Sequence, residues 1–181
     1  ATFLRGLIPT GSQDPFALRR QTIGAVHILT AGEIHWDVRK GVKMALALLP
    51  GTQEEKDTAA DKVEDFFRQR IKAILLDEGV DYDIVDAVLT GAVDDVYAIF
   101  LKAHSMMDSH VKGELEMRQA VTRLVNITKG KTAVEIRPEL FTEEAEKNLY
   151  AALEKAGEEV TNAYNAYDYG SALPALKTLT V

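Results

Sequence analysis

The side chains that could do chemistry are few, and the first group lies between residues 104 and 110. His104 and Asp108 stand at i, i+4 spacing with His110 nearby, so that histidine nitrogens and a carboxylate could share a metal ion. His104, however, also continues an apolar helical face, and Met106 and Met107 are typical of core-filling residues. A metal site and a packed helix therefore both remain open as interpretations of this segment.

Other catalytic patterns are weaker. His27, His35 and Asp37 cross an expected turn and match no metal-ligand spacing, so a packed histidine is the favoured interpretation of His27. Residues 9–12 precede a helix start, but they lack the glycines and lysine of a phosphate loop. No serine, histidine and aspartate arrangement indicates a nucleophilic triad, and the absence of cysteine excludes thiolate chemistry. We therefore predict no catalytic residue, no metal ligand and no bound cofactor.

A basic segment is the stronger candidate for binding. Arg123 and Asn126 lie three residues apart on one expected helix face, Arg118 precedes them, and Lys129 and Lys131 follow directly. Guanidinium, amide and ammonium donors in this order could contact an RNA backbone and a base edge. The alternative is a solvated helix face whose terminal lysines complement the helix dipole. Composition alone does not decide between the two interpretations.

Aromatic residues near the end of the sequence raise a similar choice. Tyr150, Tyr164, Tyr167 and Tyr169 could offer surfaces on which bases stack. Tyrosines that pack between helices with solvated hydroxyl groups are the alternative.

The elements that must position these residues are predicted to be helices throughout. Asp14 and Pro15 form a helix start, and Thr52 with Glu55 has the spacing of a capping box. Apolar residues recur at helical spacing along the chain, and no apolar–polar alternation requires a strand. The expected helices span about 15–30, 36–49, 52–78, 83–89, 93–104, 117–125, 142–160 and a segment from 171 onward. The fold class is therefore all-α.

Length and composition indicate a globular protein with a real core. The chain has 181 residues, of which 46% are hydrophobic and 27% charged, and its longest apolar runs are far too short to span a bilayer. The net charge of −7 argues against indiscriminate nucleic-acid binding. Basic residues nevertheless gather in 1–50 and 112–137, which favours oriented contact with RNA. The lack of cysteine fits a reducing compartment.

The chain is expected to have two helical parts. A weak boundary near Gly91 divides residues 1–90 from residues 91–181, and Lys129–Arg137 is the best candidate for an exposed connection. At the end of the sequence, Ala172, Leu173, Leu176 and Leu179 form an apolar face that nothing later covers. We therefore expect a fragment that is cut inside a domain.

Several blocks resemble one known family in the same order. Residues 11–20 (GSQDPFALRR) closely resemble a signature of the beta subunit of bacterial-type heterotetrameric glycyl-tRNA synthetase. Residues 66–89, the segment Arg123–Ile127, residues 140–150 and Asp168–Tyr169 are similar to later blocks of that family. The resemblance covers nearly the whole chain, and the first decapeptide is its most specific part.

The resemblance implies a subunit of a ligase that joins glycine to tRNA-Gly in the cytoplasm. The alpha subunit of such an alpha2beta2 enzyme uses ATP and Mg, whereas beta supplies tRNA binding. This chain would be a non-catalytic C-terminal portion of beta, without membrane contact. Residues 1–90 would end an HD-type helical region, whose metal ligands lie upstream, and residues 91–181 would form a truncated anticodon-binding domain.

The resemblance also ranks the site residues. Arg123 and Asn126 are the first candidates for tRNA contact, followed by Lys129, Lys131 and Arg118. Arg19 and Arg20 could be interaction residues, or they could form salt bridges between helices. The alternatives for the whole chain are a metal-dependent, HD-type phosphohydrolase fragment and a helical scaffold that docks the alpha subunit.

Overall fold

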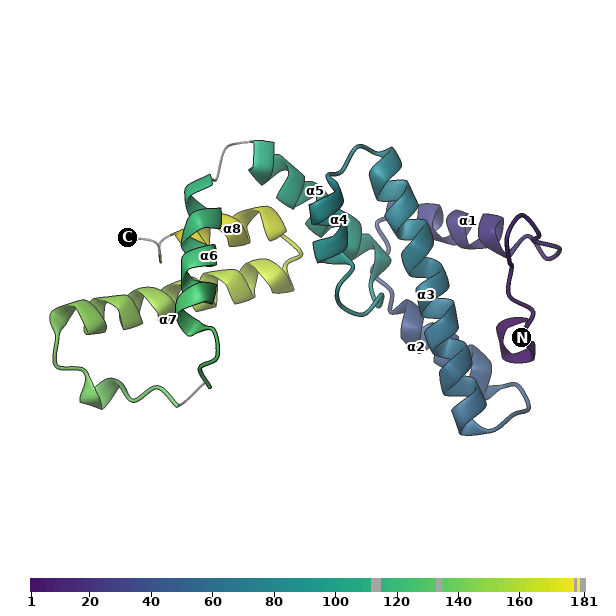
Figure 1. Ribbon diagram of the computed structural model, residues 1–181, viewed down its shortest axis with the longest axis horizontal. Helices are drawn as coiled ribbons and strands as arrows, with labels where there is room; N and C mark the ends of the chain where they lie inside the picture. The colour runs from purple at the N-terminus through teal and green to yellow at the C-terminus, as the bar shows by residue number, and fades with distance from the viewer. Residues whose placement is uncertain (112–114, 133–134, 178, 180–181) are drawn as a thin grey trace. The chain divides into compact units, whose positions relative to one another are not determined.

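The computed structural model describes residues 1–111, 115–132, 135–177 and 179 (Figure 1). Within these ranges all regular elements are helical, so the all-α prediction is confirmed. No helix of the described residues is long and apolar enough to cross a membrane. The helices are η1 Phe3–Arg5, α1 Leu18–Ala31, α2 Val38–Ala47, α3 Gln53–Asp77, α4 Tyr82–Val88, α5 Val96–Val111, α6 Leu115–Thr128, η2 Pro138–Leu140, α7 Glu144–Asn165 and α8 Tyr169–Lys177.

The chain divides into two compact units, Ala1–His104 and Ser105–Val181. This division falls inside α5 rather than near Gly91, where the sequence suggests a boundary. The physical reason is burial: Val96, Ile99 and Ala103 on the first part of α5 are all buried and complete the core of the first unit. The assignment of the parts to an HD-type region and an anticodon-binding domain stays a prediction.

The first long helix begins later than Asp14 and Pro15 suggest. Helix α1 starts at Leu18, after Ala17 takes a left-handed conformation with φ 52°. Asp14 still caps the helix, because its carboxylate accepts hydrogen bonds from the backbone N–H groups of Leu18 at 2.8 Å and Arg19 at 2.9 Å. The cap therefore acts from four residues upstream and leaves Arg19 in the first turn.

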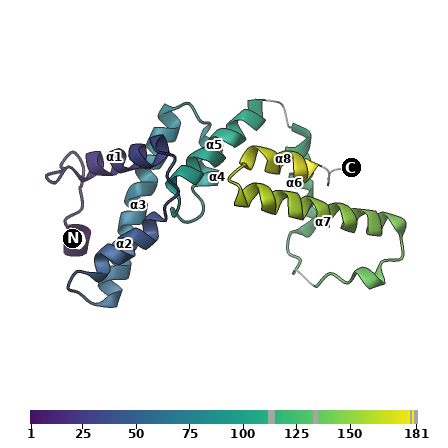
Figure 2. The ribbon, with the colours of Figure 1, turned by 180° about the vertical axis from the view of Figure 1, so that it is seen from behind.

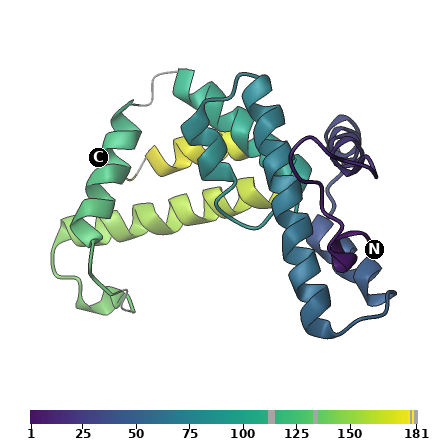
Figure 3. The same cartoon turned by 45° about the vertical axis from the view of Figure 1, so that its right-hand side comes forward.

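Helix α3 is the central element of the first unit, and its start follows the sequence signal. Thr52 accepts a hydrogen bond from the Glu55 backbone N–H, and the Glu55 carboxylate accepts one from Thr52, which confirms the predicted capping box. The helix packs against η1, α1, α2 and α4, as Figure 3 lets the reader follow. Among its inward side chains, Ile71 and Leu75 are completely buried.

A charged network crosses the apolar interior of this unit. The side chain of Glu64 on α3 is only 9% exposed, and its two carboxylate oxygens pair with Arg39 of α2 and Arg68 of α3. The same carboxylate accepts a buried hydrogen bond of 3.1 Å from the backbone N–H of Val93. Arg68 also donates to the carbonyl oxygens of Leu89 and Gly91. Glu64 therefore joins α2, α3 and the segment before α5.

The described part of the second unit contains a close pair of helices, α7 and α8, which Figure 2 shows next to each other. Small side chains make this approach possible: Ala156 and Ala163 on α7 and Ala172 and Ala175 on α8 are buried. The turn between them is held by Asp168, whose carboxylate accepts hydrogen bonds from the backbone and hydroxyl of Ser171.

Replacing the buried acid should destabilise the first unit. We expect Glu64→Ala to lower its free energy of unfolding by about 2–3 kcal/mol, because two arginines and one buried N–H lose their partner. Urea unfolding followed by the fluorescence of Trp36, the single tryptophan, measures the effect. Asp61→Ala is the matched control: Asp61 also contacts Arg39, at 3.1 Å, but is 66% exposed, so its loss should cost no more than about 0.5 kcal/mol. Equal effects would contradict the central role of Glu64.

The capping box of α3 gives a second expectation. Thr52→Ala should cost about 1 kcal/mol because the N–H of Glu55 loses its acceptor at the helix end. Thr52→Ser keeps a hydroxyl group and should stay close to wild type in the same urea titration. An alanine variant as stable as the serine variant would show that the cap contributes nothing to the unit.

Candidate nucleic-acid interface

The predicted basic residues lie in the last turns of α6 and directly after it. Arg123 and Asn126 are in the helix, and Lys129 and Lys131 follow its last residue; all four side chains are exposed. Arg118 lies on the same helix, but its side chain is outside the described part of the structure. Four of the five predicted tRNA contacts are therefore brought into one short, accessible stretch.

The chain turns tightly where α6 ends. The Lys131 backbone N–H donates to the carbonyl of Thr128 at 2.9 Å, and Gly130 between the two lysines has φ 75°. A residue with a side chain rarely adopts this left-handed conformation, so glycine permits the turn. The turn keeps Lys129 and Lys131 close to the helix end, where cations also complement the helix dipole.

These cations have no carboxylate partners among the ion pairs that the structure describes. Arg123, Lys129 and Lys131 occur in none of them, although Lys147 and Lys155 on α7 pair with glutamates. Ile127, four residues after Arg123 and therefore on its face, is exposed. The stretch thus presents an amide, an apolar side chain and cations that occur in no described ion pair, and such groups suit phosphates and unstacked bases.

The tyrosines pack against other aromatic rings. Tyr169 is buried, and its ring meets those of Tyr164 and Tyr167 edge to face, with centroids 4.9 and 6.4 Å apart. Tyr150 meets Phe141 in the same manner at 5.6 Å. This geometry favours the packing interpretation over a base-stacking surface.

His104 and His35 take part in two separate contacts. His104 Nε2 lies 3.2 Å from a Glu78 carboxylate oxygen, and His35 Nδ1 lies 2.8 Å from one of Asp95. In the part of the chain that the structure describes, no three histidine, aspartate or glutamate side chains gather as metal ligands. The side chain of His110 lies outside that part. The packed interpretation of His27 is wrong, because this residue of α1 is exposed.

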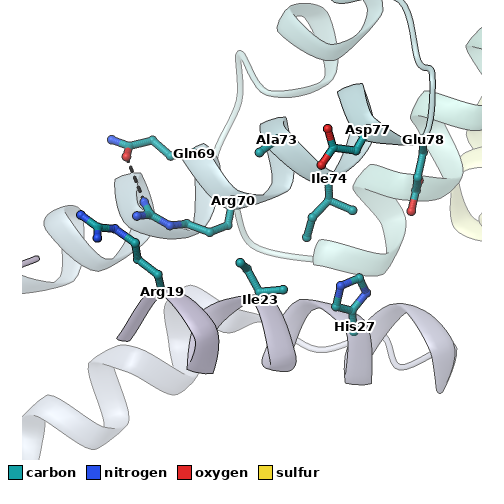
Figure 4. A pocket seen from close by; sticks show the side chains of 9 residues that line it. All are labelled: Arg19, Ile23, His27, Gln69, Arg70, Ala73, Ile74, Asp77 and Glu78. Atoms are coloured by element: carbon teal, nitrogen blue, oxygen red, sulfur yellow. Dashed lines mark hydrogen bonds between the residues drawn. The ribbon is translucent and has the colours of Figure 1, made fainter. Parts of the chain in front are cut away.

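His27 instead lines a groove between α1 and α3, with a volume of about 590 Å³ (Figure 4). One end carries Arg19, Gln69 and Arg70, and the other end carries His27, Asp77 and Glu78. Ile23, Ala73 and Ile74 form the apolar middle.

The basic end includes one residue that sequence reasoning predicted and one that it missed. Arg19 donates a 2.7 Å hydrogen bond to the Gly11 carbonyl, whereas Arg20 is exposed, and neither occurs in a described ion pair. Arg70 was missed, although its position four residues after Phe66 could have indicated a side chain stacked on that ring. Partial burial and then the nearby Arg19 guanidinium lower the pKa of Arg70, while Asp14 opposes the shift.

Comparison with known proteins identifies the family. Residues 1–90 match the family model described as glycyl-tRNA synthetase beta subunit. Curated relatives named glycine–tRNA ligase beta subunit include those of Halalkalibacterium halodurans, 37% identical over 185 residues, and Desulforamulus reducens, 34% identical over 181 residues. Each alignment covers 98% of this chain and 26% of the relative.

The relative from Bacillus subtilis is 34% identical over 178 residues, with 98% of this chain and 25% of that protein aligned. The chain therefore spans about a quarter of the length of the curated relatives it matches. The alignments with the curated relatives extend over both compact units, whereas the family model matches within the first, and the predicted family is confirmed. This chain belongs to the family of glycyl-tRNA synthetase beta subunits.

Proposed function

We propose that this chain is a tRNA-binding, C-terminal part of a glycyl-tRNA synthetase beta subunit. Its role is to hold tRNA-Gly while the complete enzyme attaches glycine. The observation that carries the proposal is the group of exposed cations at the end of α6, Arg123, Lys129 and Lys131, which have no carboxylate partner among the described ion pairs. In a chain with a net charge of −7, such a group provides a local surface for phosphate.

In the proposed division of labour this chain supplies binding. Arg123, Asn126 and the lysines offer cations and hydrogen-bond donors with which the chain would bind and orient RNA. ATP and Mg would be used by a separate alpha subunit in a cytoplasmic holoenzyme. Arg123 and the lysines would bind phosphates, and Asn126 has the donor and acceptor needed for a base edge.

A second candidate function is to dock the alpha subunit. It is favoured by large apolar side chains that are exposed on the first unit, including Ile28, Trp36, Met44 and Leu48. Exposed apolar groups of this kind are typical of protein–protein contacts. This role is compatible with tRNA binding, because the basic residues of α6 lie in the other compact unit.

Neutralising the α6 cations should weaken tRNA binding. In the full-length subunit that contains this chain, we expect Arg123→Gln/Lys129→Gln to raise the Kd for tRNA-Gly by about tenfold at 0.1 M salt. The slope of log K against log salt should become less steep by about 1 for each phosphate that the variant no longer binds. A fluorescence-anisotropy titration over several salt concentrations measures both quantities.

Lys147→Gln/Lys155→Gln is the matched control, because it removes two cations from α7 that already face glutamates. Its affinity and salt slope should stay near wild type. Equal affinity of the α6 variant and this control would contradict the assigned surface. If the α6 variant kept its tRNA affinity but no longer associated with the alpha subunit, the docking role would be favoured instead.

A further inference from the structure

The groove between α1 and α3 brings two guanidinium groups together from distant parts of the sequence. Arg19 is in the first turn of α1, and Arg70 is in the C-terminal half of α3. Both also line a second hollow of about 360 Å³, with Gly11, Lys62 and Phe66 among its walls. Figure 4 shows both arginine heads at the same end of the groove, next to Gln69.

Neither guanidinium is neutralised by an ion pair that the structure describes. Arg19 donates to the Gly11 carbonyl, and Arg70 donates to the Phe66 carbonyl at 3.2 Å and to Gln69 Oε1 at 2.9 Å. By contrast, Arg39 and Arg68 in the same unit pair with carboxylates. The arginines that hold the fold together are thus compensated, whereas this pair retains its charge.

The local contacts also orient the pair. The Arg70 guanidinium lies over the Phe66 ring, 3.6 Å from its centroid, which fixes the plane of its N–H groups. Arg19 is fixed by its bond to Gly11, next to the helix start that Asp14 caps. Because both side chains are already held in place, binding an anion between them would cost little further side-chain conformational entropy.

Around this end, Arg19, Arg70 and Lys62 outnumber the single acid that lines the same hollow, Asp65, and Asp65 itself lies 3.8 Å from the Arg68 guanidinium. Repulsion from Arg19 contributes to the lowered pKa of Arg70. A negatively charged ligand would offset this repulsion between the two guanidinium groups. Asp14, the acid that opposes this effect, already accepts two backbone N–H bonds. Asp77 and Glu78 lie at the opposite end and would repel an anion there, which restricts it to the arginine end.

We propose that Arg19 and Arg70 form a second phosphate-binding site, which holds a backbone phosphodiester of the same RNA on the first unit. Planar guanidinium forks match phosphate oxygens in pairs, and Gln69 adds an amide N–H donor beside them. The inference rests on the proposed tRNA-binding function and extends it from α6 to the groove between α1 and α3.

The test uses the full-length subunit and its tRNA-Gly in the same salt titration. Arg19→Gln/Arg70→Gln should raise the Kd about tenfold or more at 0.1 M salt, and the salt slope should fall by about 1 for each phosphate that is no longer bound. Lys40→Gln/Lys43→Gln is the matched control, because it removes two exposed cations from the same unit. It should change the Kd by less than about threefold.

A milder variant guards against a folding defect. Gln69 is exposed, and Gln69→Glu places a carboxylate beside Arg70 without removing the stacked guanidinium. It should weaken tRNA binding severalfold while the urea midpoint of the first unit stays unchanged. Arg19→Lys/Arg70→Lys keeps both charges without the forks, so its Kd should lie between those of wild type and the glutamine variant.

The outcomes separate this inference from the proposed function. If wild type binds tRNA and Arg123→Gln/Lys129→Gln weakens it, but the groove variants bind like their control, only the groove site is overturned. If wild type does not bind tRNA, both proposals fail. If the groove variants no longer bind the alpha subunit while keeping their tRNA affinity, the arginines bind a protein carboxylate, and the phosphate site is wrong.

Discussion

The Glu64 carboxylate, buried between two arginines and a backbone N–H, is the interaction on which the first unit depends. A buried charge is costly unless its oxygens find partners, so the contacts of this group with Arg39, Arg68 and Val93 restrict how its neighbours pack. These contacts fix α2 through Arg39 and the segment before α5 through Val93 and Arg68. Apolar packing alone would allow these elements to slide, because the hydrophobic effect is not directional.

The fixed position of α3 has consequences for binding. One face of this helix carries the buried network and the apolar core, and another carries Arg70, Gln69 and Ile74 beside α1. The groove is therefore built on rigid helices rather than on loops, which holds its polar groups in place. The α6 site differs in kind: its lysines follow a helix end and a glycine turn, so they contribute charge with less fixed geometry.

The two proposed basic sites illustrate how local charge can differ from the net charge of the chain. The chain is acidic overall, but several acids are engaged within the fold: Glu64 with arginines, Asp14 and Glu55 at helix starts, and Asp95 with His35. Their charge is compensated locally, whereas Arg70, Arg123 and Lys129 occur in no ion pair among the described residues. The electrostatic potential at a given surface depends on such uncompensated charges nearby and not on the net charge of the whole sequence.

The sequence by itself determined the helical class, the capping box at Thr52, the basic segment after Arg123 and the family. These features are local: periodicity, cap spacing and a contiguous motif are visible within a few residues. Tertiary structure decided the late start of α1, the exposed position of His27 and the meeting of Arg19 with Arg70. Helical spacing gives the face of each residue on its own helix, but not which face of another helix it meets. That choice depends on packing between segments far apart in the chain, here α1 and α3 held around a single buried core.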